Sequence, residues 1–141
     1  MKRYLIVANQ TLGGDHLMDL LRERVEAGPC TLHTLVPATV DHTDWTSDEE
    51  SDRELAQRRL DLALDRFGRF DVEVTGEVGD HLVVDSLLDV LRRERFDEVI
   101  LSTLPPGISR WLRLDLISRV ERAVDVPVTH VIGERTEVGS G

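Results

Sequence analysis

The chain alternates between short apolar runs and amphipathic helical segments, and this alternation limits its possible folds more than any other feature. Residues 4–8 form a continuous apolar run, which is typical of a strand buried in a parallel sheet, and further strands are predicted at about residues 30–36, 72–75, 98–101 and 126–132. Between them, four segments carry apolar residues at helical spacing. Regular β-α alternation predicts a parallel sheet with helices on both faces and right-handed crossovers.

Cap and turn residues indicate where several of these elements begin and end. Ser47 and Glu50 fit a capping box for the second helix, which is expected to end at Gly68. The third strand is expected to close in a glycine-containing turn at residues 76–79. Asp80, which follows that turn, is predicted to cap the third helix.

The number and order of the elements predict a single α/β domain covering residues 1–141. Its sheet is doubly wound, five-stranded and parallel, with the strand order 3-2-1-4-5. In this order the winding reverses between the first and fourth strands, so the loops at residues 9–14 and 102–109 are expected to lie side by side. Open α/β sheets bind ligands at such a point, and the topology therefore locates a candidate site before any motif is considered.

The second of these loops joins the fourth strand to a helix that is expected to begin near Ser109. Ser102 and Thr103 offer hydroxyl groups at the strand end, and Gly107 gives the backbone freedom to approach a ligand closely. Arg110 adds a cation near the amides of a helix start. This combination suits a small anion.

The alternative interpretation of the same loop is structural. Arg110 or Arg113 would pair with Asp115, and Trp111 would pack beneath the loop. Charged residues at the start of a helix often serve only this purpose, and the sequence leaves both interpretations open.

Composition and charge weigh against several functional classes. A net charge of −10 argues against nucleic-acid binding, which needs a basic face, and against an anionic membrane surface. No apolar segment approaches the ~20 residues that span a bilayer, and no signal peptide is recognisable at the start. Cys30 is the single cysteine and cannot form an internal disulfide, which favours a reducing compartment. A cytoplasmic location is expected.

Catalytic and metal-binding patterns are weak in this sequence. The five histidines show no tight metal-binding spacing, Cys30 has no evident activating base, and there is no G-x-S-x-G elbow. We therefore expect no bound metal and no enzymatic activity. Trp45, within the acidic segment at residues 41–54, is either packed against the body of the protein or available to a protein partner.

Taken in order, several segments resemble the universal stress protein family over nearly the whole chain. Residues 5–8 resemble its first strand, and residues 32–37, which include a histidine, are similar to its second. Residues 76–80 followed by a helix resemble its third unit, and residues 126–128 resemble the start of its last strand. The resemblance implies the same fold, termed adenine nucleotide alpha hydrolase-like.

Nucleotide-binding members of that family carry a G-x2-G-x9-G-[S/T] pattern after the fourth strand, where glycines let the backbone wrap the phosphates. Two alignments are available here, one starting at Ser102 and one anchored on Pro127. Neither restores a glycine, and both place Asp115 among residues that should face phosphate, which its carboxylate would repel. The first-strand aspartate of those members is also replaced, by Asn9 or Gln10. The resemblance implies the fold and a degenerate nucleotide pocket.

Two functions remain open on this basis. The first is a non-enzymatic stress-response or regulatory dimer that needs no cofactor and acts through a protein partner or an unidentified ligand. The second is an ATP- or AMP-binding protein with an altered phosphate loop. A hydrolase or transferase ranks last because no base or nucleophile is positioned for it. The candidate binding residues are Asn9, Gln10, Val36, Ser102, Thr103, Gly107, Arg110 and Asp115.

The last strand, which is expected to begin at Val126 and end at Ile132, lies at the edge of the predicted sheet. An apolar edge strand needs cover, and a second copy of the same chain is a common cover. In the resembled family such strands pair across a dimer. A homodimer through this strand is therefore expected.

Overall fold

The computed structural model describes residues 1–38 and 49–133 of the protein. The strands are β1 (Lys2–Val7), β2 (Cys30–Pro37), β3 (Glu73–Gly79), β4 (Glu98–Thr103) and β5 (Val128–Ile132). The helices are α1 (Asp15–Ala27), α2 (Glu49–Phe67), α3 (Val83–Arg93), α4 (Arg110–Arg113) and α5 (Leu116–Ala123), with a 3₁₀ helix at Gly68–Phe70. All strand pairs are parallel, and their order is β3-β2-β1-β4-β5. The predicted doubly wound α/β fold is confirmed.

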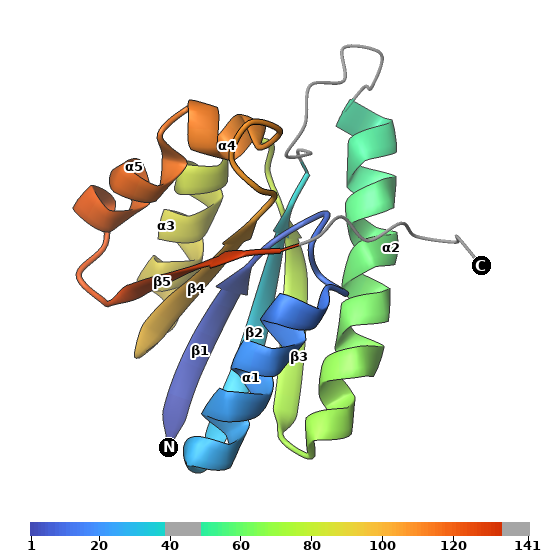
Figure 1. The fold of residues 1–141 in the computed structure, drawn as a ribbon, viewed down its shortest axis with the longest axis vertical. Helices are drawn as coiled ribbons and strands as arrows, with labels where there is room; N and C mark the ends of the chain where they lie inside the picture. The colour runs from blue at the N-terminus through green and yellow to red at the C-terminus, as the bar shows by residue number, and fades with distance from the viewer. Residues whose placement is uncertain (39–48, 134–141) are drawn as a thin grey trace.

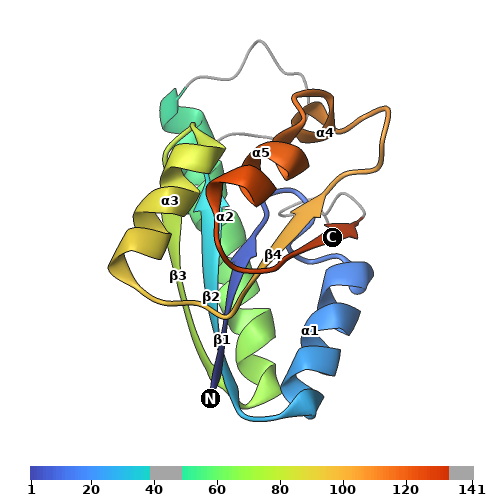
Figure 2. The same ribbon diagram turned by 90° about the vertical axis from the view of Figure 1, so that its left-hand side faces the viewer.

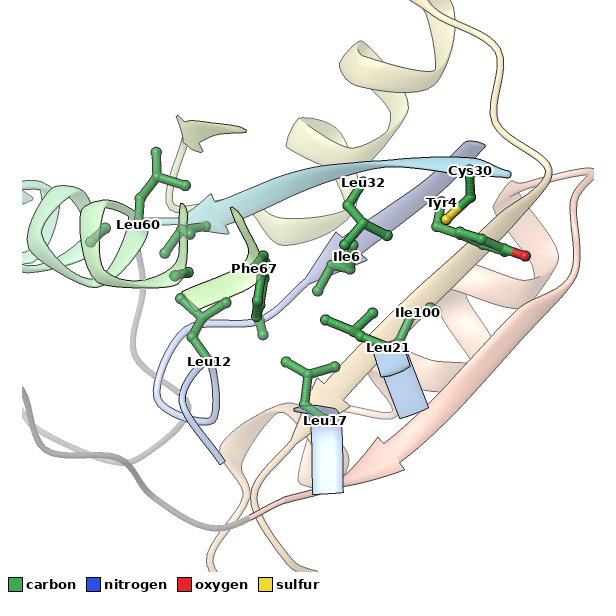
Figure 3. Close-up of a cluster of buried hydrophobic side chains, with 14 residues drawn as sticks. Tyr4, Ile6, Leu12, Leu17, Leu21, Cys30, Leu32, Leu60, Phe67 and Ile100 are labelled. Atoms are coloured by element: carbon green, nitrogen blue, oxygen red, sulfur yellow. The ribbon is translucent and has the colours of Figure 1, made fainter. Parts of the chain in front are cut away.

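Helices cover both faces of the sheet, with α1 and α2 on one side and α3, α4 and α5 on the other (Figures 1 and 2). The core under α1 and α2 gathers Leu17, Leu21, Leu60 and Phe67 against the sheet (Figure 3). The second core lies under α3 and α5 and includes the side chain of Trp111, which the sequence placed beneath its loop. Within the described residues, no helix combines the length and apolar character that crossing a bilayer requires.

The third strand is longer than predicted, and the expected turn at residues 76–79 is wrong. Those residues continue β3 and pair with the end of β2, with Gly76 opposite Thr34 and Gly79 opposite Pro37. The glycines are explained by helices that approach the strand closely. A Cβ atom at Gly76 would lie 2.5 Å from Leu60 Cδ1 in α2, and one at Gly79 would lie 2.9 Å from Ser86 Cβ in α3.

The start of α3 also differs from the expectation that Asp80 caps it. The cap position belongs to Leu82, whose side chain cannot accept a hydrogen bond. Asp80 instead accepts the backbone N–H of His81 at 2.6 Å, and this hydrogen bond lowers the pKa of the Asp80 carboxyl. Ser86 connects α3 to the segment before it, because its Oγ accepts the backbone N–H of Asp80 at 2.7 Å. Ser47, which was predicted to cap α2, lies outside the described residues.

The last helix is divided in two. Ser109 begins α4 as predicted, since its Oγ accepts the N–H of Leu112 at 3.1 Å. The helix ends one turn later, and Asp115 adopts the left-handed conformation with φ 56° before α5 begins. This break changes the direction of the chain, so that Trp111 from α4 and Leu116 from α5 both enter the same core.

A polar contact ties α1 to the two strands on the β5 side of the sheet. The Arg24 guanidinium donates two hydrogen bonds to the Glu98 carboxylate, at 3.0 and 3.1 Å, and the Thr129 hydroxyl donates a third. Burial alone would raise the pKa of Glu98, but these hydrogen bonds outweigh burial and lower it. The carboxylate thus stays charged where α1, β4 and β5 meet.

We predict that Gly79→Ala lowers the free energy of unfolding by about 1–3 kcal/mol, since the added Cβ meets the Cβ of Ser86, which cannot rotate away. Gly68→Ala is the matched control, because a Cβ there has no neighbour within 4 Å, and it should change stability by no more than about 0.5 kcal/mol. Urea unfolding measures both. Equal stability of the two variants would contradict the packing explanation for the glycines of β3.

Candidate functional site

The topology brings the ends of β1 and β4 together. The register pairs Val7 of β1 with Leu101 of β4, so that the residues immediately after each strand are neighbours. Asn9 and Gln10 leave β1, while Ser102 and Thr103 complete β4. This is the point where the sheet's winding reverses, as the sequence predicted.

A hydrogen bond between hydroxyl groups fills the space between these two strand ends. Thr11 Oγ1 and Ser102 Oγ lie 2.5 Å apart, and both residues are at least 98% buried. The chain leaving β5 covers the pair: a Cβ at Gly133 would lie 3.1 Å from Thr11 Cβ and 3.4 Å from Ser102 Oγ. The backbone N–H of Gly133 donates to the Thr103 carbonyl at 2.8 Å, which fixes this cover. Three segments distant in sequence therefore meet at the strand ends.

Asn9 uses both ends of its amide for contacts within the protein. Its Nδ2 donates to the Pro37 carbonyl at 2.8 Å, and its Oδ1 accepts a hydrogen bond from Arg59 of α2. Asn9 is 2% exposed. The side chain that follows β1 thus joins β1 to the end of β2 and to α2.

Thr103 takes part in a second hydrogen-bonded group between β4 and β5. Its hydroxyl donates to the Leu104 carbonyl at 3.0 Å and lies 2.7 Å from His130 Nε2. Because the single hydroxyl hydrogen is used in the first bond, Nε2 of His130 is the donor in the second. Thr103 is fully buried, so its hydroxyl is not accessible as a nucleophile.

Four amides of the β4–α4 connection and of α4 are bound within this segment. The N–H groups of Ile108 and Ser109 both donate to the Pro105 carbonyl, at 3.3 and 3.0 Å. In α4, the N–H of Leu112 donates to the Ser109 side chain and the N–H of Arg113 donates to the Ser109 carbonyl. These amides, which the sequence offered to an anion, are engaged in the turn and the cap.

The eight candidate residues therefore fall into two groups. Five lie inside the protein at the strand ends: Asn9, Gln10, Val36, Ser102 and Thr103. The other three, Gly107, Arg110 and Asp115, are exposed on the β4–α5 connection. Gly107 has φ 96° with open space around it, and Asp115 forms no ion pair with Arg110 in the described part of the chain. Arg110 lines a groove whose described lining includes none of the five buried residues.

Four residues that close the strand ends were not among the candidates: Thr11, Arg59, His130 and Gly133. Thr11 carried a usable signal, since it is a hydroxyl residue in the loop after β1, on the side predicted to face Ser102. Arg59 and Gly133 carried none, because their roles depend on where α2 and the end of β5 pack.

Nucleophilic and metal chemistry find little support in the described residues. Cys30 is buried, and this burial raises the pKa of its thiol, which disfavours the reactive thiolate. Across residues 1–38 and 49–133, no three histidine, cysteine or acidic side chains are placed to hold a metal ion.

No family model and no curated protein matches the sequence. Solved structures do match the fold. A universal stress protein family protein from Arabidopsis thaliana with AMP bound has a TM-score of 0.64 at 14% identity, over 96% of this chain and 93% of that one.

Two further solved structures also match the fold of this chain. A universal stress protein family protein from Burkholderia pseudomallei has a TM-score of 0.56 at 16% identity, covering 92% of this chain and 94% of its own. The universal stress protein from Archaeoglobus fulgidus in complex with dAMP has a TM-score of 0.55 at 15% identity, covering 93% and 98%. At these identities the likeness concerns the fold, and this chain has the fold of the universal stress proteins.

Proposed function

We propose that the protein is a non-enzymatic regulatory protein of the universal stress protein type, in which the nucleotide site is closed by the chain's own polar contacts. The hydrogen bond between Thr11 and Ser102, covered by Gly133, is the observation that carries this proposal. It occupies the strand ends where an open α/β sheet would receive a ligand.

The connection from β4 to α5, where nucleotide-binding members of the resembled family carry their phosphate-binding pattern, supports the same proposal. The G-x2-G-x9-G-[S/T] pattern is absent, and the loop amides that could replace it bind the Pro105 carbonyl and Ser109. Asp115 adds a carboxylate at the start of α5, where a phosphate would be repelled. A protein built in this way would act by binding another molecule elsewhere on its surface.

The competing function is an ATP- or AMP-binding protein with an altered phosphate loop. The specific observation in its favour is that matching structures were solved with AMP and with dAMP. In this chain a nucleotide at the strand ends would have to displace the Thr11–Ser102 contact and free the Asn9 amide.

Homodimerisation through β5 is part of the proposal. β5 lies at the sheet edge and pairs with β4 along one side. Its residues are all partly or largely exposed, ending at Ile132, which is 43% exposed. His16 donates to the Ile132 carbonyl at 2.7 Å and protects one group of this edge. A second β5 strand would cover the rest.

The Thr11–Ser102 contact can be measured with a double-mutant cycle. Thr11→Val and Ser102→Ala should each cost about 1–3 kcal/mol of unfolding free energy, because each leaves a buried hydroxyl without its partner. The double variant should cost less than the sum of the two by at least about 0.5 kcal/mol. Strict additivity in urea unfolding would show that the two hydroxyls do not interact.

Nucleotide binding is tested by titrating the EDTA-treated protein with millimolar ATP or AMP, with and without magnesium, in calorimetry and thermal shift. We expect no binding heat and no shift, whereas a nucleotide at 100 times its Kd would stabilise the fold by about 2.7 kcal/mol. Ser102→Gly combined with Asp115→Ser removes the hydroxyl contact and the carboxylate, and it should create measurable affinity. Tight binding to the native chain would establish the competing function.

The dimer is tested by sedimentation of the native chain and two matched variants. The native protein should sediment as twice the 15.9 kDa chain, and Ile132→Lys should sediment as one chain because the charge enters the β5 edge. Ile108→Lys is the control, since Ile108 is similarly exposed, at 52%, but lies in the β4–α4 loop. A native monomer, or equal effects of both variants, would overturn assembly through β5.

A further inference from the structure

A groove of about 330 Å³ lies between the start of α3 and the α4–α5 pair; we call it the α3–α5 groove. Both views of the ribbon place α3 beside α5 on this side of the molecule (Figures 1 and 2). Its volume is at the small end of the range for ligand sites, about 300–1,000 Å³. The groove is separate from the closed strand ends, since none of Asn9, Thr11, Ser102 and Thr103 lines it.

Two arginines give the groove its charge. Arg110 of α4 and Arg119 of α5 both line it and are exposed. In the described part of the chain neither guanidinium forms an ion pair, although the protein carries a net charge of −10. Other arginines here are paired, as in the contacts of Arg3 with Glu94 and of Arg93 with Glu77. The two arginines thus line the same groove without an acidic partner among the described residues.

The remaining charged residue of the groove limits how much negative charge a ligand can carry. Asp85, in the first turn of α3, is also part of the lining. Two guanidinium groups and one carboxylate leave one net positive charge, and His81, which also lines the groove, lies 2.6 Å from the Asp80 carboxylate. This balance favours a monoanion over a phosphate dianion or a triphosphate.

The walls of the groove are apolar. Leu82, at the N-cap of α3, and Leu114, at the C-cap of α4, line it and are 51% and 53% exposed, which is high for large apolar side chains. Between them, Trp111 and Leu116 form buried parts of the lining. A ligand with an apolar body would remove this leucine surface from water, and a purely inorganic anion would not.

We propose that the α3–α5 groove binds a small organic carboxylate with an apolar body. Arg110 and Arg119 hold the carboxylate, and Leu82, Leu114 and Trp111 contact the body of the molecule. The guanidinium fork matches carboxylate geometry, and the single charge of the ligand matches the net charge of the groove. This site is independent of nucleotide binding at the strand ends.

The first test uses the fluorescent probe anilinonaphthalene sulfonate, a monoanion with an aromatic body, in titrations of the native full chain. Arg119→Glu and Arg110→Glu should each weaken binding about tenfold or more, because each removes a charge-assisted contact and adds repulsion. Arg122→Glu is the matched control. It makes the same charge change on the exposed side of α5, outside the groove lining, and should leave the affinity within about twofold.

The second test asks whether the carboxylate itself is recognised. Decanoate should displace the probe from the native chain, and decanol, which has the same number of carbon atoms but no charge, should not. In a Trp45→Phe background Trp111 is the single tryptophan, so its emission should change on adding decanoate.

Each outcome decides the proposal, provided the variants show native thermal unfolding. The proposal is supported if Arg110→Glu and Arg119→Glu lose affinity for the probe while Arg122→Glu keeps it, and if decanoate but not decanol displaces the probe. Equal losses in Arg119→Glu and Arg122→Glu would reveal general electrostatic attraction and overturn it. Equal displacement by decanol, or no probe binding at millimolar concentration, would also overturn it. A failure here leaves the ATP titration unaffected, so the two proposals can fail separately.

Discussion

The parallel pairing of β1 with both β2 and β4 is the constraint on which the rest of the structure depends. Leu5, Ile6 and Val7 are completely buried in this central strand, so β1 needs cover on both faces as well as a strand on each side. Parallel neighbours can be joined only by crossovers, which place helices on both faces. The reversal of winding at β1 and β4, and the meeting of their ends, follow from this arrangement.

Polar residues at that meeting point could serve a ligand or the protein itself. Several of them reach other segments of the chain: Thr11 contacts Ser102, Asn9 contacts Pro37 and Arg59, and Thr103 contacts His130. These contacts supply partners to polar groups that are buried in the fold. Open, charged and partly apolar surface is found instead beside α3, where the break at Asp115 sets α4 and α5 at an angle.

The fold could be predicted from the sequence because apolar periodicity and chain order determine the topology. What was missed depends on contacts between distant segments. Gly76 and Gly79 suggest a turn locally, yet they are glycines because α2 and α3 pass close to β3. The topology predicted that the loops containing Asn9 and Ser102 lie side by side. It did not predict the hydrogen bonds made there, since the Thr11–Ser102 bond spans 91 residues and the Arg59–Asn9 bond spans 50. Helical spacing continued through Asp115, so the break there had no periodic signal.

The position of Gly133 has a consequence for how the molecule can respond to its surroundings. This residue leaves the edge strand β5 and at the same time covers Thr11 and Ser102. Separating the ends of β1 and β4 would therefore require the end of β5 to move. By thermodynamic linkage, any partner that binds β5 in its present place opposes that separation, and any molecule that forces the separation weakens binding at β5. Gly133 thus connects the sheet edge to the ends of β1 and β4.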